Sequence, residues 1–71
     1  MLLDFTLYVP SLPDAIIPVY VSSNHIVSLE KRTYMDGESE IEYTNIKMQD
    51  GTQYLVKEAS VWIARLVNSL G

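Results

Sequence analysis

Few side chains in this 71-residue sequence have the types and spacing that catalysis requires. His25 is the only histidine, and no aspartate or glutamate adjoins it to orient its ring as a general base. Serines are plentiful, but none has the spacing of a hydrolase nucleophile. The three glycines, Gly37, Gly51 and Gly71, are too scattered for a phosphate-binding loop. The sequence therefore predicts a protein that is not an enzyme and that binds no cofactor.

One group of acidic side chains stands at alternate positions, in Asp36, Glu38, Glu40 and Glu42. A calcium loop requires its ligands on a compact turn, with closer and mixed spacing. On a strand, alternate carboxylates line one side, so we interpret this group as solvated charge and predict no metal site. The chain has no cysteine, so neither a disulfide nor a thiolate metal site can form.

The charge balance argues against nucleic acid as a partner. The net charge is −4, and only five residues are basic: Lys31, Arg32, Lys47, Lys57 and Arg65. Nucleic-acid binders carry a basic stripe, whereas only two of these five adjoin. No apolar run approaches the ~18 residues of a membrane span, and the N-terminal MLLDFTLYV lacks the basic segment of a signal peptide. The prediction is a cytoplasmic protein without a membrane partner.

The stretch Thr44–Leu70 organises the rest of the chain, because it reads as a hairpin that runs into a helix. Asp50-Gly51 predicts a tight turn, since Gly adopts positive φ without steric cost. A two-residue loop would place Met48 opposite Gln53. A three-residue loop with a bulge at Gly51 gathers more apolar side chains on one face, and we prefer it. Its register pairs Met48 with Thr52, Ile46 with Tyr54 and Thr44 with Val56.

A second hairpin is predicted from strands Ile26–Met35 and Glu38–Gln49, joined by Asp36-Gly37. A loop of those two residues pairs Lys31 with Glu42, Leu29 with Thr44 and Val27 with Ile46. Glu40 and Glu42 then share the face of Ile46, where unpaired charge cannot be buried. Either a bulge near Thr44-Asn45 swaps the faces, or the hairpin from Lys31 to Tyr43 projects beyond the core. We favour projection.

The first third of the chain adds two strands and a proline-rich segment. Leu3, Phe5, Leu7 and Val9 alternate with polar residues, and a shorter strand follows Pro18. Between them, Pro10–Pro18 is either a loop that buries Ile16 and Ile17 or an apolar arm that reaches a neighbouring subunit or partner.

A helix over residues 59–69 closes the chain, with Ala59, Trp62, Ile63, Leu66, Val67 and Leu70 on one arc. Val61 and Arg65 lie outside this arc, where Val61 is either one exposed residue or part of a face that packs on another protomer. The prediction for residues 1–71 is therefore a single α+β domain, a strongly bent antiparallel sheet of about five strands covered by one C-terminal helix. Its core should contain Trp62, Ile63, Leu66 and Leu70 against Phe5, Leu7, Val27, Leu29, Ile46, Tyr54 and Val56.

From Pro18 onward the segments PVYVSSNHIVSLE and IKMQDGTQYLVKEASVWIARLV resemble small FlbD/SwrD-type flagellar accessory proteins and related short domains of unknown function. The matching features are a strand, an Asn-containing turn before Ile26, the Asp50-Gly51 turn and a strand that runs into a helix. A more distant resemblance is to the strand core of LytTR DNA-binding domains, whose basic loops this sequence lacks. Neither resemblance implies a catalytic residue.

Small domains without disulfides often gain burial by association, because a chain this short buries only about 60% of its unfolded surface. We therefore predict a non-enzymatic interaction module that forms a homodimer or higher homo-oligomer and binds and modulates an unknown protein partner, as a bacterial accessory protein or a phage-type inhibitor. The alternative is small-ligand, nucleotide-like binding at a subunit interface with Lys31, Arg32 or Arg65; nucleic-acid binding ranks third. The predicted interaction residues are Leu12, Ile16, Ile17, Tyr34, Met35, Ile41, Tyr43, Val61 and Arg65.

Overall fold

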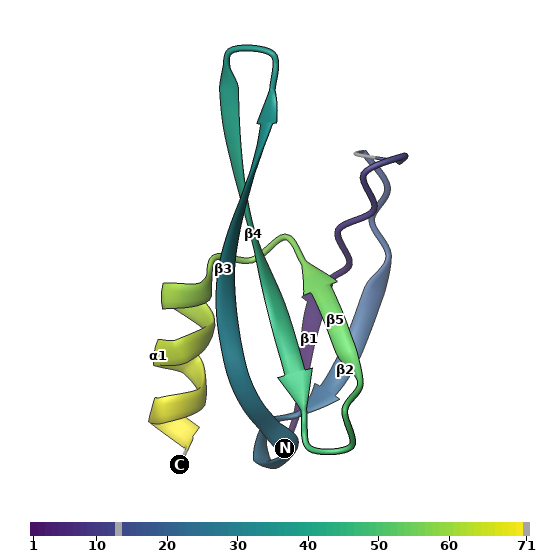
Figure 1. Cartoon of the computed structure of the whole chain (residues 1–71). Coiled ribbons are helices and arrows are strands. Elements are labelled where there is room, and N and C mark those ends of the chain that lie inside the picture. Colours follow the sequence, from purple (N-terminus) through teal and green to yellow (C-terminus); the bar gives the residue numbers. More distant parts are fainter. Residues whose placement is uncertain (13, 71) are drawn as a thin grey trace.

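The computed structural model describes residues 1–12 and 14–70, apart from the side chain of Leu70. Within these residues, five strands are followed by one α-helix, with a short 3-10 helix between the second and third strands (Figure 1). The α+β class and the C-terminal helix are therefore as predicted. The elements in chain order are β1 (Leu2–Thr6), β2 (Pro18–Ser22), η1 (Ser23–His25), β3 (Ile26–Asp36), β4 (Ser39–Met48), β5 (Gln53–Val56) and α1 (Ser60–Leu70).

The strands form two antiparallel sheets, so the prediction of one bent five-stranded sheet is not confirmed. β1 pairs with β2, and the second sheet has the order β3-β4-β5. A single bridge between Leu7 and Val56 joins them, and the amide of Tyr8 donates to the carbonyl oxygen of Leu55 at 2.8 Å. The pairing stops there because the chain turns away at Val9, whose carbonyl oxygen accepts from the amide of Leu12 at 2.9 Å.

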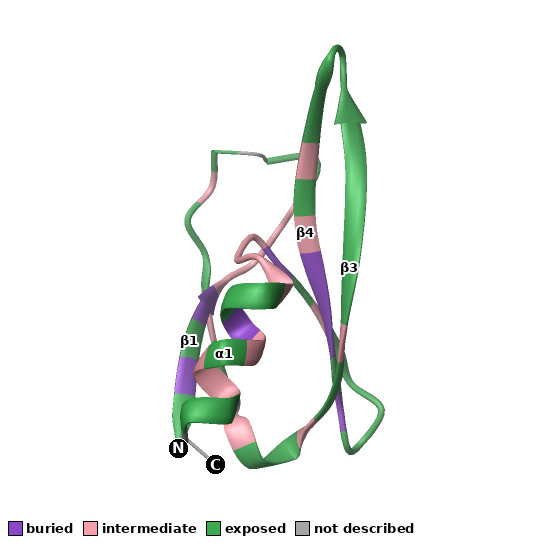
Figure 2. Cartoon of the chain, turned by 90° about the vertical axis from the view of Figure 1, so that its left-hand side faces the viewer, coloured by how far each residue is buried: buried purple, intermediate pink, exposed green. Residues whose placement is uncertain are grey.

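The hydrophobic core lies between the two sheets, and α1 closes one open side of it. Figure 2 shows the helix between β1 and the β3-β4 pair, with its buried segment turned inward. Ile63 is fully buried there, and Phe5 meets the ring of Trp62 edge-on with centroids 6.5 Å apart. The buried apolar side chains are Leu3, Phe5, Val21, Ile46, Met48, Val56 and Ile63.

The hairpin at Asp50-Gly51 has the predicted three-residue loop. Ile46 pairs with Tyr54, and the amide of Met48 donates to the carbonyl oxygen of Thr52 at 2.8 Å. Gly51 has a φ of +92°, a backbone angle that residues other than glycine rarely adopt. The Asp50 carboxylate accepts from the amide of Thr52 at 2.9 Å and holds the turn. This register is confirmed because the glycine sits where the bulge needs it.

The register predicted for β3 and β4 is wrong by two residues. Asp36 pairs with Ser39, so the loop is Gly37-Glu38 rather than Asp36-Gly37. Gly37 has a φ of +64°, and among the described residues other than glycine none has positive φ. That combination fits a type II′ turn, which places glycine first in the loop, whereas a type I′ turn would need positive φ at Glu38 as well.

Two apolar residues predicted for the core lie largely outside it. Val27 is 60% exposed, because a register shift between Ile26 and Ser28 lets it leave the pairing with β4. Trp62 is 51% exposed, and its ring meets the core residue Phe5 edge-on. The helix is therefore rotated so that Ile63 takes the central position. The packing predicted for the Leu70 side chain falls outside what the structure describes.

Candidate interaction surface

The far ends of β3 and β4 form a two-stranded ribbon, residues 31–43, that extends beyond α1 and the β1-β2 sheet (Figures 1 and 2). The molecule is 38 Å long and 20 Å across in the other two directions. Every residue from Glu30 to Glu40 is exposed. This is the predicted projection, and it removes the conflict over the glutamates, because Glu40 and Glu42 lie where no core needs to form.

The pairing of β3 with β4 sorts the ribbon side chains onto two faces. Arg32 pairs with Tyr43, and Tyr34 pairs with Ile41, so these four share one face. Met35 pairs with Glu40 on the opposite face. Three of the four predicted ribbon residues therefore come together, and Met35 does not join them.

Tyr8 completes this face from another part of the chain. Its ring stacks on the ring of Tyr43, with centroids 4.5 Å apart and an angle of 8° between the planes. Partial burial raises the pKa of the Tyr8 phenol above its ordinary value of 10.0, and Tyr34, Tyr43 and Asp36 add to the shift. We call the set Tyr8, Arg32, Tyr34, Ile41 and Tyr43 the tyrosine face. Sequence reasoning placed Tyr8 as a polar partner in strand alternation and missed this contact.

A buried amide lies two residues beyond Tyr43 on the same side of β4. Asn45 is only 7% exposed, and its Nδ2 donates to Oε1 of Gln53 at 2.9 Å. Its Oδ1 is buried and has no hydrogen-bond partner among the residues that the structure describes. An unsatisfied buried oxygen costs about 1–3 kcal/mol. The sequence offers no signal for it, since polar residues on an outer sheet face are ordinary.

The basic residues predicted for a ligand site do not converge within one chain. Neighbouring strand residues point to opposite faces, so Lys31 and Arg32 lie on different sides of β3, while Arg65 is on α1. Arg32 is 2.7 Å from the carboxylate of Glu30, and Lys31 is 4.0 Å from Glu42. A ligand site shared between two copies stays a prediction.

The proline-rich arm, residues 10–18, presents its apolar residues to solvent within the part of it that the structure describes. Ile16 is 83% exposed and Leu12 is 57% exposed. The arm is held at its base, where the amide of Leu7 donates to the carbonyl oxygen of Ile17 at 2.8 Å and Nζ of Lys57 donates to that of Ala15 at 2.9 Å. The alternative in which this loop buries its isoleucines is therefore wrong for Ile16, whereas Ile17 is 37% exposed.

The outer side of α1 carries the remaining predicted interaction residues. Val61 is 60% exposed, and Arg65 is exposed as well. The ribbon rises beyond the end of the helix in both views (Figures 1 and 2). Val61 and Arg65 therefore belong to a surface separate from the tyrosine face.

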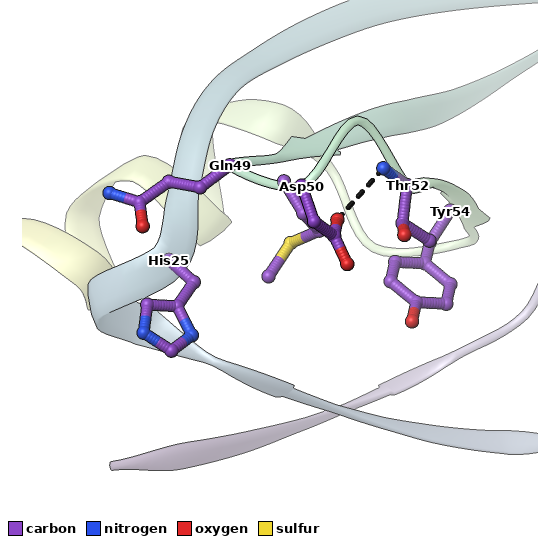
Figure 3. Close-up of a pocket in the computed structure, with 6 residues that line it drawn as sticks. His25, Gln49, Asp50, Thr52 and Tyr54 are labelled. Atoms are coloured by element: carbon purple, nitrogen blue, oxygen red, sulfur yellow. Dashed lines mark hydrogen bonds between the residues drawn. The ribbon is translucent and has the colours of Figure 1, made fainter.

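A hollow of about 340 Å³ lies at the opposite end of the molecule, beside the Asp50-Gly51 turn (Figure 3). Met48 and Tyr54 supply its apolar surface. The hydrogen bond from the amide of Thr52 lowers the pKa of the Asp50 carboxyl, with a smaller contribution from His25. The hollow can accommodate a small polar ligand, and its lining residues are His25, Met48, Gln49, Asp50, Thr52 and Tyr54.

No protein-family model matches the sequence, and comparisons with curated proteins and solved structures likewise give no significant match. The resemblance to FlbD/SwrD-type proteins therefore stays a prediction. Within residues 1–12 and 14–70, no group of three or more His, Cys, Asp or Glu side chains could hold a metal ion. The α-helix that the structure describes is not long and apolar enough to cross a membrane.

Proposed function

We propose that this protein is a small non-enzymatic interaction module of the cytoplasm that associates with itself and binds a protein partner. The supporting observation is the tyrosine face, an aromatic and aliphatic cluster built on a ribbon that the fold does not cover. Tyr34 itself contributes little to the fold, because it is 49% exposed and lies beyond the core. An accessory or inhibitory role is the simplest use for such a surface on a domain of this size.

Physical chemistry favours protein as the ligand of this face. Tyrosine and arginine are enriched at protein interfaces, because they supply large contact areas together with a polar group. A two-stranded ribbon is marginally stable by itself and gains order by docking. The net charge of −4 works against nucleic acid, which needs positive neutralising charge.

The test compares two immobilised baits in cell lysate. One is the wild-type protein, and the other carries Tyr34→Ser and Ile41→Ser, two changes on the tyrosine face outside the buried core. The matched control carries Thr33→Ser on the opposite face. We expect the wild type and the control to retain the same protein and the double variant to lose it, with unchanged circular dichroism. Equal retention by all three baits would contradict a role for this face.

The hollow beside Asp50 supports a second candidate, which is small-ligand binding. Its volume lies at the lower end of the range for ligand pockets, about 300–1,000 Å³, and His25, Asp50 and Thr52 offer both donors and acceptors. A nucleotide panel tested by thermal shift and by ¹⁵N chemical-shift perturbation checks this candidate. Shifts at Thr52 and Tyr54 that vanish in His25→Ala support it, and an unresponsive spectrum rejects it.

A further inference from the structure

We propose that the far end of β3 pairs antiparallel with the same segment of a second copy, with Tyr34 facing Tyr34 on the two-fold axis. This inference rests on the proposed self-association and specifies its interface. Two features of the chain indicate that the partner strand comes from a second copy. The edge of β3 is open in this fold, and its charges complement those of an identical strand in one register.

The open edge follows from the sheet order and the place of the helix. β3 stands at the end of the order β3-β4-β5. α1 contacts β3 and lies beside its first half, and the far half rises beyond the helix (Figure 1). The segment Thr33-Tyr34-Met35 there is uncharged and lacks proline and glycine. Charge and proline are the features that protect strand edges, so this edge remains competent to pair.

Backbone alternation identifies the groups that would bond. Asp36 and Ser39 flank the two-residue loop, so they form a pair that exchanges two backbone hydrogen bonds. Such pairs alternate with pairs that exchange none, so every second residue of β3, counted back from Asp36, bonds to β4. The residues between them, including Thr33 and Met35, direct their amide and carbonyl groups toward the open edge. A second strand could therefore accept and donate at both positions.

Symmetry restricts the register. In an antiparallel pair, two residues that face each other point to the same side of the sheet. When the two strands are identical and related by a two-fold axis, one residue must therefore lie on the axis and face its own copy. If the axis passed through Lys31 or Arg32, that cation would face its own copy. If it passed through Thr33, Glu30 of each copy would face Asp36 of the other. These three registers are disfavoured, because like charges that face each other destabilise a strand pair.

Centring on Tyr34 is the register that the charges favour. It places Arg32 opposite Asp36 on both sides of the axis, and Met35 opposite Thr33. Centring on Met35 would leave only three strand residues in the overlap. The Tyr34 register also continues the tyrosine face across the axis, because Tyr34 lies on that face. Only five strand residues pair in each copy, so the dimer should be weak and should dissociate on dilution.

Disulfide trapping tests this register, because the chain has no cysteine of its own. Tyr34 would face itself in a pair without hydrogen bonds, where the Cα atoms are about 4.5 Å apart, and disulfides tolerate Cα separations of about 4.4–6.8 Å. We expect Tyr34→Cys to form a cross-linked dimer quickly under mild oxidation. Thr33→Cys and Met35→Cys are the matched controls on the same ribbon. They should react much more slowly, because residue 33 of one copy would face residue 35 of the other, so neither cysteine would face a cysteine.

A charge exchange gives an independent readout that needs no cysteine. Arg32→Asp and Asp36→Arg should each lower the dimer fraction at a fixed concentration, and the double variant should restore it. Rapid trapping of Thr33→Cys instead of Tyr34→Cys would overturn the register. If the wild type dimerises but all three cysteines react equally slowly, this interface is wrong while self-association stands. If the wild type is monomeric at every concentration, self-association fails as well.

Discussion

The ring of Tyr8 lies flat against the ring of Tyr43, with 4.5 Å between the centroids. This contact ties the segment after β1 to the base of the ribbon, through residues that are far apart in the sequence. It holds one side of the tyrosine face in place, while Tyr34 and Ile41 lie further along the ribbon. The face is therefore partly preorganised, and preorganisation reduces the cost of binding.

A double-mutant cycle measures this contact. Tyr8→Ala and Tyr43→Ala should each destabilise the fold, and the double variant should lose less stability than the sum of the two losses, because each single change already removes the stack. Urea unfolding followed by circular dichroism gives the three values. Tyr20→Ala serves as the control, since Tyr20 is 65% exposed on the outer side of β2. Strict additivity of Tyr8 and Tyr43 would show that their stacking contributes nothing.

The hydroxyl of Thr44 anchors the segment that leads into α1. Thr44 is fully buried, and its Oγ1 donates to the carbonyl oxygen of Glu58 at 2.7 Å. The Glu58 carboxylate in turn accepts from the amide of Thr6 at 2.9 Å, which ties β1 to the same segment.

Thr44→Val should lower the free energy of unfolding by about 1–3 kcal/mol, because it keeps the side-chain shape but leaves the Glu58 carbonyl unsatisfied. Thr33→Val on the exposed ribbon should change it by less than about 0.5 kcal/mol. Chemical denaturation of the two variants checks this. Equal effects at both positions would mean that the Thr44 hydrogen bond is not a stabilising contact.

The orientation of α1 is tested by two apolar residues on its opposite sides. Ile63 is fully buried, whereas Val61 is 60% exposed. Ile63→Ala should cost about 2–5 kcal/mol, which is enough to unfold a domain of marginal stability, since it removes core contacts and leaves a cavity. Val61→Ala should be nearly neutral. Thermal melts distinguish the two, and a larger loss at Val61 would indicate a helix turned the other way.

The turn at Asp50 gives a pH dependence with a definite sign. The pKa of the folded carboxyl lies below the value of 3.8 for an unperturbed aspartate, because the charged form accepts the Thr52 amide. The charge of Asp50 therefore stabilises the fold above pH 3.8, and this contribution is lost as the pH falls through the folded pKa.

Urea unfolding at neutral pH and below pH 3.8 measures that loss. Asp50→Asn keeps an acceptor oxygen without the charge, so its stability should fall below that of the wild type at neutral pH and approach it in acid. Asp50→Ala removes the acceptor and should remain less stable at both values. A constant gap between wild type and Asp50→Asn across the range would contradict the assigned cause.

The sequence predicts the register of one hairpin correctly and that of the other incorrectly. At Asp50-Gly51 the apolar pattern on both strands selected one register, and that register is correct. At Asp36-Gly37 the pattern is weak because the ribbon has no buried face, and the two pairs that favour the predicted register, Lys31 with Glu42 and Val27 with Ile46, do not form in β3 and β4. The side chains of Lys31 and Glu42 do meet, but diagonally across the strands, 4.0 Å apart.

Features that depend on distant segments were not predictable from local patterns. The division into two sheets depends on the chain turning away after Tyr8, and the exposure of Val27 depends on a bulge that no glycine marks. The tyrosine face was only partly predicted: alternation along the ribbon placed Tyr34, Ile41 and Tyr43 on a projecting element. The contact of Tyr8 was missed because it joins the segment after β1 to β4, two parts of the chain that local patterns do not align. The burial of Asn45 gave no signal, because a polar residue on the outer face of a hairpin is ordinary.

The central claim, that this domain associates through surfaces it leaves open, is tested most directly by its mass in solution. Light scattering behind a sizing column should be recorded at several concentrations. The account predicts a mass that rises from the 8.1 kDa of one chain toward twice that value as the concentration increases. A mass of 8.1 kDa at every concentration would contradict self-association and leave the tyrosine face to a different protein.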